Sequence, residues 1–290
     1  MLPGAFVNHF HFRRGRFWAE GVSLSRIAES VGTPVYVYST ATIDRHVAVV
    51  QRAFRHRQPL ICYAVKANST LAILKRFVDW QVGFDIVSGG ELERVLKVGG
   101  DAKKIVFSGV GKREDELTAA LRAGILMINV ESAEELRAID RLGRRLKLKA
   151  PIALRVNPDV DPKTHPAIAT GLKTSKFGVA FDEAVSLYRS AKQMKGVVAR
   201  GIDCHIGSQL TNVRPLREAV VKIAGLIQQL GREGHQISHV DVGGGLGIRY
   251  HRENPPTLAA YSRAICEPLS AIDATLIVEP GRVLVGNAGV

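Results

Sequence analysis

Eight short apolar runs recur along the 290-residue chain, and amphipathic stretches with helical spacing separate them. The apolar runs are 60–65, 83–87, 104–107, 125–130, 151–156, 197–205, 238–242 and 275–279. The helical stretches lie near 70–80, 90–98, 112–123, 132–142, 181–193, 213–233 and 257–269. The runs show no inside/outside alternation, which is typical of parallel strands covered on both faces. Eight βα units predict an α/β fold that closes into a (β/α)8 barrel of the TIM type, rather than an open doubly wound sheet.

The N-terminal part of the chain does not follow this repeat. It predicts two short strands, 10–12 and 17–19, and a helix at 24–31 that Ser23 caps and Gly32 ends. After an extended segment, a second helix is predicted to begin at Ser39–Thr40. Its inner face carries the apolar positions Ile43, Val47, Val50 and Phe54.

Composition limits the kinds of partner. The chain is 46% hydrophobic and 23% charged, and none of its apolar runs approaches the ~20 residues of a membrane span. The formal charge of +13 is scattered, and zinc-finger, basic-heptad and RNP-like patterns are absent from the sequence. We therefore expect no metal, nucleic acid or membrane partner. The N-terminus lacks the features of a signal peptide, and the three cysteines form no CxxC pair, so we expect reduced thiols in a cytoplasmic protein.

Lys66 stands where the first apolar run ends, within the stretch 63–69 (YAVKANS). An ammonium beside apolar walls is costly to keep charged, so its pKa is expected to fall and its amine to become nucleophilic. Such an amine can hold an aldehyde cofactor as a Schiff base. Taken alone, Lys66 is better explained as a strand-end lysine that reaches into water.

The other chemically distinctive residues also follow the predicted strands, where the active sites of such barrels lie. They are Asp85 with 88–91, 108–111, 129–131, 155–158, 204–208, 241–247 and 279–282. The connection at 157–180 is polar and rich in Gly and Pro, and a loop of that length is uncommon unless it is functional.

The stretch 241–247 (DVGGGLG) is the most informative of these after Lys66. Its glycines let backbone N–H groups converge on an anion, and the loops after strands 7 and 8 usually bind phosphate in such barrels. A dinucleotide loop is disfavoured, because position 248 is Ile248 and the G-x-G-x-x-G spacing fails. A plain glycine-rich turn remains an alternative.

Glu279 and Arg282 lie three residues apart on a Pro-Gly turn. They could pair with each other or a neighbour. Alternatively, Arg282 could bind an anion while Glu279 keeps a ring nitrogen protonated. His205 could be a core histidine or could stack on a cofactor. Together with Lys66 and the glycine loop, these groups describe a site for pyridoxal 5'-phosphate.

At this point the chain resembles the alanine-racemase-like, fold-type III pyridoxal-phosphate decarboxylases. The matching stretches are 63–69 (YAVKANS), 83–85 (GFD), 88–92 (SGGEL), 154–158 (LRVNP), 170–178 (TGLKTSKFG), 204–209 (CHIGSQ), 241–247 (DVGGGLG) and 279–282 (EPGR). The stretch 170–178 and Gln209 favour the branch that acts on diaminopimelate over the ornithine and arginine branches.

The resemblance implies roles for individual residues. Lys66 and His205 would be catalytic, and Arg282 would also contact the substrate. The implied cofactor-binding residues are Lys66, Asp85, His205, Ser208, Gly243, Gly244, Gly245, Glu279, Pro280, Gly281 and Arg282. The implied reaction is loss of carbon dioxide from meso-diaminopimelate to give L-lysine. A sister decarboxylase for another basic amino acid and a non-catalytic cofactor-binding barrel remain alternatives.

The resemblance also implies a domain organisation. Residues 1–34 would form an arm, 35–283 the cofactor-binding barrel, and 284–290 the start of a C-terminal β-domain that is truncated here. In the family, that domain supplies the proton donor and completes a homodimer.

Overall fold

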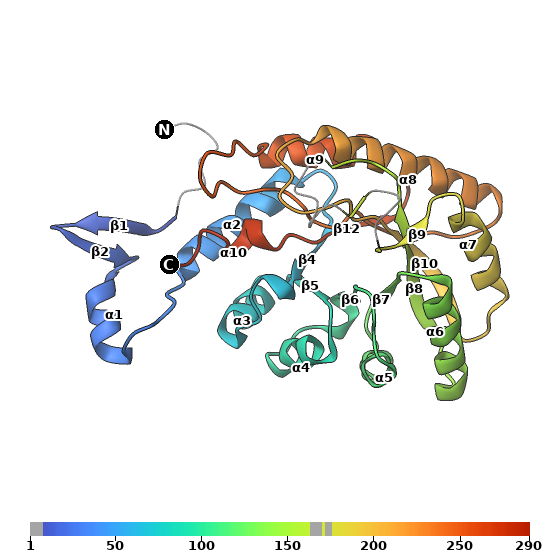
Figure 1. Ribbon diagram of the computed structural model, residues 1–290, viewed down its shortest axis with the longest axis horizontal. Helices are drawn as coiled ribbons and strands as arrows, with labels where there is room; N and C mark the ends of the chain where they lie inside the picture. The colour runs from blue at the N-terminus through green and yellow to red at the C-terminus, as the bar shows by residue number, and fades with distance from the viewer. Residues whose placement is uncertain (1–7, 163–169, 172–175) are drawn as a thin grey trace.

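The computed structural model describes residues 8–162, 170–171 and 176–290. Part of the predicted motif 170–178 and part of the loop 157–180 therefore lie outside the described residues, as do the first seven residues of the predicted arm. Figure 1 shows a ring of helices around a central barrel, with a smaller N-terminal unit that lies apart from it.

The barrel consists of eight parallel strands, one for each predicted apolar run. They are β4 (Leu60–Ala64), β5 (Gly83–Ile86), β6 (Ile105–Phe107), β7 (Met127–Val130), β8 (Ala150–Asn157), β10 (Val197–Asp203), β11 (His239–Asp241) and β12 (Thr275–Val278). Each strand pairs with its neighbours in chain order, and the pairing of β12 with β4 closes the ring. The predicted α/β barrel is confirmed. The interpretation of 157–180 as a connection too polar and too rich in Gly and Pro for a strand is wrong at its end, where β9 (Val179–Ala180) pairs with the end of β8.

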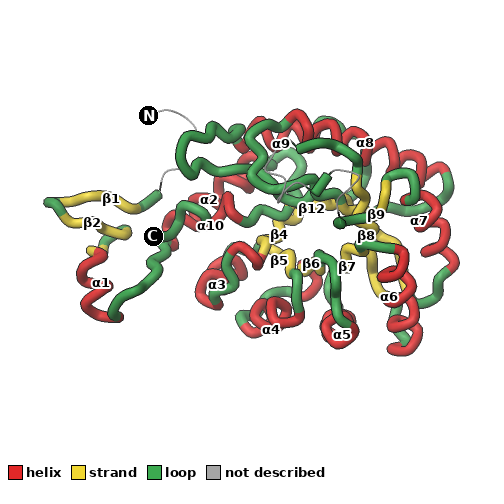
Figure 2. Tube along the Cα trace, viewed as in Figure 1, coloured by secondary structure: helices red, strands yellow, loops and turns green. Residues whose placement is uncertain are grey.

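Helices alternate with the strands and surround the barrel (Figure 2). They are α3 (Leu71–Asp79), α4 (Gly89–Lys97), α5 (Glu114–Ala123), α6 (Ala133–Leu146), α7 (Ala184–Gln193), α8 (Arg214–Arg232), α9 (Leu258–Cys266) and α10 (Arg282–Val285), with short 3-10 turns η1 (Val65–Ala67) and η2 (Ala102–Lys104). Local sequence explains several starts. The hydroxyls of Ser88, Ser132 and Thr257 each accept a backbone N–H of the first helical turn. Among the described helices, we find none with the length and apolar character to cross a membrane.

Helix α2 (Thr40–Ala53) completes the ring of helices. The helix after the last strand, α10, has only four residues. Helix α2 precedes the first barrel strand, packs against α9 and α10, and buries its predicted inner face. On its other side, the carboxylate of Asp44 binds both the guanidinium of Arg76 and the indole N–H of Trp80, two residues at the end of α3. A helix from before the barrel therefore lies between α9 and α3.

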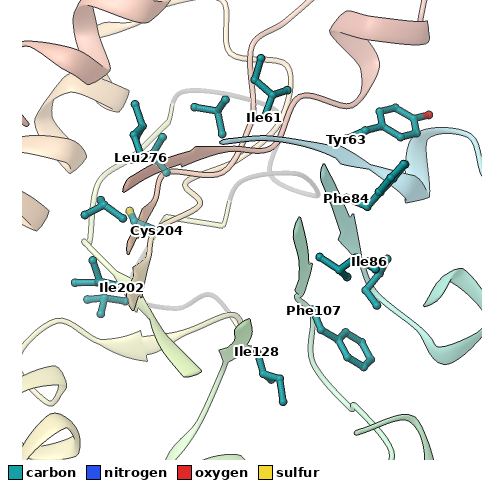
Figure 3. Close-up of a cluster of buried hydrophobic side chains, with 14 of the residues drawn as sticks. Ile61, Tyr63, Phe84, Ile86, Phe107, Ile128, Ile202, Cys204 and Leu276 are labelled. Atoms are coloured by element: carbon teal, nitrogen blue, oxygen red, sulfur yellow. The ribbon is translucent and has the colours of Figure 1, made fainter. Parts of the chain in front are cut away.

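The outer surface of the barrel carries the large apolar side chains that pack against the helices. In Figure 3, Phe84, Ile86 and Phe107 point away from the barrel axis toward that layer. Tyr63 does the same, and its ring stacks on Phe77 of α3 with centroids 4.0 Å apart. The predicted two-sided burial of the strands is consistent with this layer.

The inner surface has two layers of different chemistry. Five buried side chains form an apolar plug, namely Cys62, Val106, Met127, Ala153 and Ile277. Side chains two positions further along a strand face the same side. In four of these strands that position is polar, with Ser108, Asn129, Arg155 and Glu279. The barrel interior therefore changes from apolar to polar toward the carboxyl ends of the strands.

The N-terminal unit is a small antiparallel sheet of β1 (Phe10–Arg13), β2 (Arg16–Ala19) and β3 (Val22–Ser23), followed by α1 (Leu24–Val31). The predicted strands and the helix with its Ser23 cap and Gly32 end are confirmed. The Glu20 carboxylate accepts the Ser39 hydroxyl at 2.7 Å and the Ala41 N–H at 2.9 Å, which ties the unit to the start of α2. The proposed division into parts at 34/35 and 283/284 stays a prediction.

The Asp44 contact predicts a measurable contribution to stability. In Asp44→Ala, Arg76 loses a two-pronged partner and Trp80 loses its acceptor, so the free energy of unfolding should fall by about 1–3 kcal/mol. Urea denaturation would measure this. Asp79→Ala removes the exposed partner of Lys75 and a 4.0 Å contact with Arg76, both at the surface, and should cost no more than about 0.5 kcal/mol. Equal losses in the two variants would contradict this account of how α2 is held.

Candidate active site

A cavity of about 420 Å³ opens at the carboxyl ends of the strands. Nine of the eleven residues predicted to bind a cofactor line it: Lys66, His205, Ser208, Gly244, Gly245, Glu279, Pro280, Gly281 and Arg282. The other two touch lining residues, because Asp85 binds Lys66 and Gly243 packs on His205. Lys66 and the glycine loop lie far apart in the sequence, but both line this cavity.

Lys66 lies in η1, immediately after β4 ends. The hydroxyl of Tyr63 donates to the carbonyl of Asn68 at 3.0 Å and so fixes the turn that carries the lysine. The side chain of Lys66 is 51% exposed, and its ammonium forms an ion pair with the fully buried carboxylate of Asp85 on the neighbouring strand.

The expected drop in the pKa of Lys66 is wrong. Burial disfavours the ammonium, but the negative charge of Asp85, with a smaller contribution from the acidic group of Glu279, outweighs it and raises the pKa of Lys66 above its ordinary value. Lys66 therefore rests as a cation and must lose a proton before its nitrogen can react with an aldehyde.

Below the cavity lies a set of buried polar side chains at the strand ends, which we call the polar floor. It comprises Asp85, Ser108, Asn129, Glu131, Arg155, Asp203, Asp241 and Glu279. The Asn129 amide donates to the Ser108 hydroxyl at 3.1 Å and to Asp241 at 3.4 Å. The Ser108 hydroxyl donates in turn to Glu279 at 3.5 Å. This chain of contacts crosses the barrel from β7 to β12.

Burial dominates the acid–base behaviour of the floor. Burial and the neighbouring carboxyl groups of Asp241 and Asp85 raise the pKa of Glu279 well above its ordinary value. Burial likewise raises the pKa of Asp241 to about 6. A cationic group placed beside Glu279 would favour its ionised form and would itself keep its proton.

His205 follows β10, and its ring is oriented by the glycine loop. The Gly244 N–H donates to Nδ1 at 3.3 Å, which leaves the proton of the neutral ring on Nε2. Burial, with the positive charges of Arg155 and Lys66, holds the pKa of His205 well below its ordinary value. A neutral, flat ring is thus presented at the cavity wall.

The glycine loop lies in contact with the ends of two neighbouring strands. Gly243 has φ of +64°, and a methyl group there would lie 2.1 Å from Nδ1 of His205. At Gly244 and Gly245 the added carbon would lie 2.2 Å from the Glu279 carbonyl oxygen and 2.5 Å from the Gly207 carbonyl oxygen. These contacts explain why side chains are excluded here and why backbone lines the cavity.

Arg282 begins α10 and is held by groups from other loops. Its guanidinium donates to Gln209 at 3.1 Å and lies 5.6 Å from the ring centroid of Tyr250. Gln209 also joins the backbone of Ile248 through two hydrogen bonds. The ion pairs found among the described residues include neither Glu279 nor Arg282, so the alternative in which these two pair with each other is not favoured.

Sequence reasoning assigned no role to Arg155 and its partners. The buried guanidinium of Arg155 forms ion pairs with Glu131 at 2.9 Å and with Asp203 at 3.8 Å, and it lies 4.8 Å from the ring centroid of Phe177. Glu131 also accepts the Gly109 and Gly178 N–H groups. The available signal was position, because Arg155 and Glu131 both stood at predicted strand ends.

Comparison with known proteins agrees with this geometry. Residues 40–286 match the family of pyridoxal-dependent decarboxylases, over its pyridoxal binding domain. The chain belongs to this family. The diaminopimelate decarboxylase of Pseudomonas aeruginosa is 51% identical over 98% of this chain and 68% of that protein, and the enzyme of the same name from Vibrio cholerae is 49% identical over 98% and 69%. The resemblance indicated by the motifs is confirmed.

A solved structure supports the same assignment. The crystal structure of diaminopimelate decarboxylase from Helicobacter pylori, complexed with L-lysine, has a TM-score of 0.89 to this chain. It is 41% identical, and the match covers 91% of this chain and 67% of that one. The decarboxylase family therefore accounts for the barrel as well as for the motifs.

The residues present fit the cofactor that gives the family its name. Pyridoxal phosphate needs an amine, an anion-binding turn and a carboxylate for its ring nitrogen. Lys66, the glycine loop and Glu279 provide these groups around one cavity. A side chain at any of the three glycines would collide with neighbouring atoms, so only glycine lets the backbone form this wall of the cavity.

Gly243 offers a test of the loop geometry. Gly243→Ala should force His205 aside and weaken pyridoxal phosphate binding by about tenfold or more, because a displaced ring loses its fixed place at the cavity. An absorbance titration would measure binding, and urea denaturation would measure stability. Gly111→Ala is the matched control, since Gly111 has φ of +76° with nothing within 4 Å of the added carbon. It should cost only the backbone strain of about 1–2 kcal/mol and leave binding intact. Equal binding by both variants would contradict the proposed role of the contact.

The Lys66–Asp85 pair predicts a pH effect with a definite sign. Asp85 raises the pKa of Lys66, so Asp85→Asn should lower that pKa and increase the fraction of neutral amine at a given pH. The rate at which pyridoxal phosphate becomes bound should then rise at lower pH than in the wild type. Stopped-flow absorbance between about pH 6 and pH 9 would record the profile. Asp79→Asn, at an exposed carboxylate, should leave the profile unchanged. A shift of the Asp85→Asn profile to higher pH would refute this interpretation.

Proposed function

We propose that the chain binds pyridoxal 5'-phosphate through Lys66 and acts in the decarboxylation of meso-diaminopimelate to L-lysine and carbon dioxide. One observation carries the proposal: an amine, a backbone-lined glycine wall and a buried carboxylate from three separate strands face a single cavity. The 51% identity to a diaminopimelate decarboxylase supports the choice of substrate. The crystallised relative in complex with L-lysine supports the choice of product.

The residues around the cavity have distinct proposed tasks. Lys66 would bind the cofactor aldehyde, and its neighbour Asp85 would hold the amine in place. Ser208, Gly243, Gly244, Gly245, Pro280, Gly281 and Arg282 would form the cradle for the phosphate and the rest of the cofactor. When bound, the cofactor supplies a ring that accepts the electrons left by loss of a carboxyl group.

Two residues would control the ring itself. His205, kept neutral and fixed by Gly244, would pack on one face of the ring. Glu279 would face the ring nitrogen and keep it protonated, since an ionised carboxylate in a buried site strongly favours a neighbouring cation. Arg282, with its guanidinium anchored by Gln209, would also meet a substrate carboxylate.

The proposal extends to assembly and location. We propose a homodimer for the complete enzyme, which light scattering of the chain and of a full-length relative would test. A cytoplasmic location is favoured by the three free cysteines, Cys62, Cys204 and Cys266, because free thiols persist in a reducing compartment. Fractionation of cells that express the chain would test it.

Covalent labelling tests the central residue. After addition of pyridoxal phosphate and reduction with borohydride, mass spectrometry should find one pyridoxyl group on the peptide that contains Lys66. The label should be lost in Lys66→Arg, which keeps the positive charge, and retained in Lys75→Arg at an exposed lysine. A label that stays in Lys66→Arg would overturn the assignment.

Substrate choice needs a separate measurement. The rate of carbon dioxide release from meso-diaminopimelate should fall at least about a hundredfold in Lys66→Arg, because the variant lacks the amine that binds the cofactor. Lysine and ornithine are the comparison substrates. Release from either of these at a higher rate would favour a sister decarboxylase. A labelled protein that releases carbon dioxide from none of the three would favour a non-catalytic binding barrel.

A further inference from the structure

The polar floor holds more acid than base. Five of its side chains carry carboxyl groups, namely Asp85, Glu131, Asp203, Asp241 and Glu279. The cations that reach them are Lys66, which pairs with Asp85, and Arg155, which pairs with Glu131 and Asp203. The ion pairs found among the described residues leave out Asp241, which is 0% exposed, and Glu279, which is 7% exposed. Two buried carboxyl groups thus lack a cation of their own.

These two groups lie at the ends of neighbouring strands. Asp241 ends β11 and Glu279 follows β12, and the two strands pair in parallel with Asp241 opposite Ile277. The hydrogen bond from Asn129 to Ser108 links the donors of the two carboxyl groups. Two neighbouring buried carboxylates without a cation disfavour each other's ionised form, so a single proton held between them is favoured. The remaining contacts come from neutral donors: Asn129 and the Gly243 N–H donate to Asp241, and Ser108 donates to Glu279. A shared proton is the arrangement that satisfies both groups.

Several other groups that titrate or carry charge face the pair from the surrounding strands and from α9. They are Cys62 on β4 and Lys66 after it, Asp85 on β5, Arg155 on β8, Asp203 on β10 and Tyr261 on α9. The hydroxyl of Tyr261 is already committed to the Gly244 carbonyl at 2.7 Å. Of the other carboxyl groups, Asp203 is the nearest competitor for the proton, because it is also deeply buried beside Asp241.

We propose that Asp241 is a positioning residue that shares one proton with Glu279 when no ligand is bound, and that this proton passes to a basic ring nitrogen placed against Glu279. In that transfer the carboxyl O–H bond breaks, the ring N–H bond forms, and Glu279 is left as the carboxylate that faces the new cation. The second half of this inference rests on the proposed cofactor role of Glu279. The first half concerns the protein alone and stands independently of it.

Infrared spectroscopy of the ligand-free chain at neutral pH tests the shared proton. A protonated carboxyl group has a C=O band distinct from that of carboxylates. The wild type should show this band, and both Asp241→Asn and Glu279→Gln should lose it, because removing either acid lets the other ionise. Asp203→Asn is the matched control: it makes the same charge change in the same floor, yet it should keep the band. A band that survives in both test variants, or disappears only in Asp203→Asn, would overturn the proposal.

The wild type provides a second route should a variant fail to fold, which circular dichroism would reveal. Carbon-13 labelling of glutamate carboxyl groups should shift part of the band, since a shared proton resides partly on Glu279. The band should persist above about pH 5, where ordinary carboxyl groups are ionised. Sharing would be refuted by a band that has already disappeared when the pH is raised to about 5, or by a band that does not respond to glutamate labelling.

Calorimetry tests the transfer. Pyridoxal 5'-phosphate is titrated into the chain in two buffers with different ionisation enthalpies, which yields the protons exchanged on binding. In the wild type the pair supplies the ring proton, whereas in Asp241→Asn the solvent must supply it. The variant should therefore take up about one proton more than the wild type. Equal proton counts would refute the transfer while leaving the infrared result intact. Failure of the wild type to bind at all would instead count against the proposed function.

Discussion

Burial of carboxyl groups inside a closed barrel is the constraint on which the site depends. Closure excludes water from the barrel interior, so every charge placed there needs a partner. The chain meets this need by filling one layer of the interior with the apolar plug and grouping its polar side chains at the carboxyl ends of the strands. The ion pairs of Lys66 and Arg155 compensate part of the negative charge. Of the two carboxyl groups outside these ion pairs, Glu279 lines the cavity, where a neighbouring cation would favour its ionised form.

The error about Lys66 shows what sequence alone could not supply. The apolar run before it suggested desolvation as the dominant effect, and that effect is present. The opposing carboxylate of Asp85 comes from the next strand, where Ala64 and Asp85 are paired in register. The sequence identifies Asp85 as an acid at a strand end, but whether the pKa of Lys66 rises or falls depends on the contact between these two neighbouring strands. A contact of this kind is set by register, which neither segment reveals alone.

Local signals predicted local structure well. The apolar runs located the eight barrel strands, and Ser23 and Gly32 marked the ends of α1. Features that rest on distant contacts were missed. Strand β9 has only two residues and exists through its pairing with β8, and Arg155 gains its place from Glu131 and Asp203 on neighbouring strands. Likewise, the sequence predicts α2 as a helix, but its position is set by packing against α9 and the four-residue α10, which follow it by about 200 residues.

The glycine loop shows how topology turned three modest motifs into one site. Strands β10, β11 and β12 are neighbours in the barrel, so the segments after them must meet. Gly243 makes room for the ring of His205, and Gly244 lies against the Glu279 carbonyl, so the middle motif is shaped by the motifs on both sides. Each segment alone is consistent with an ordinary turn. Parallel order in a closed barrel is what places an imidazole, a backbone-lined wall and a carboxylate around the same cavity, and this order was the part of the fold that the sequence predicted most directly.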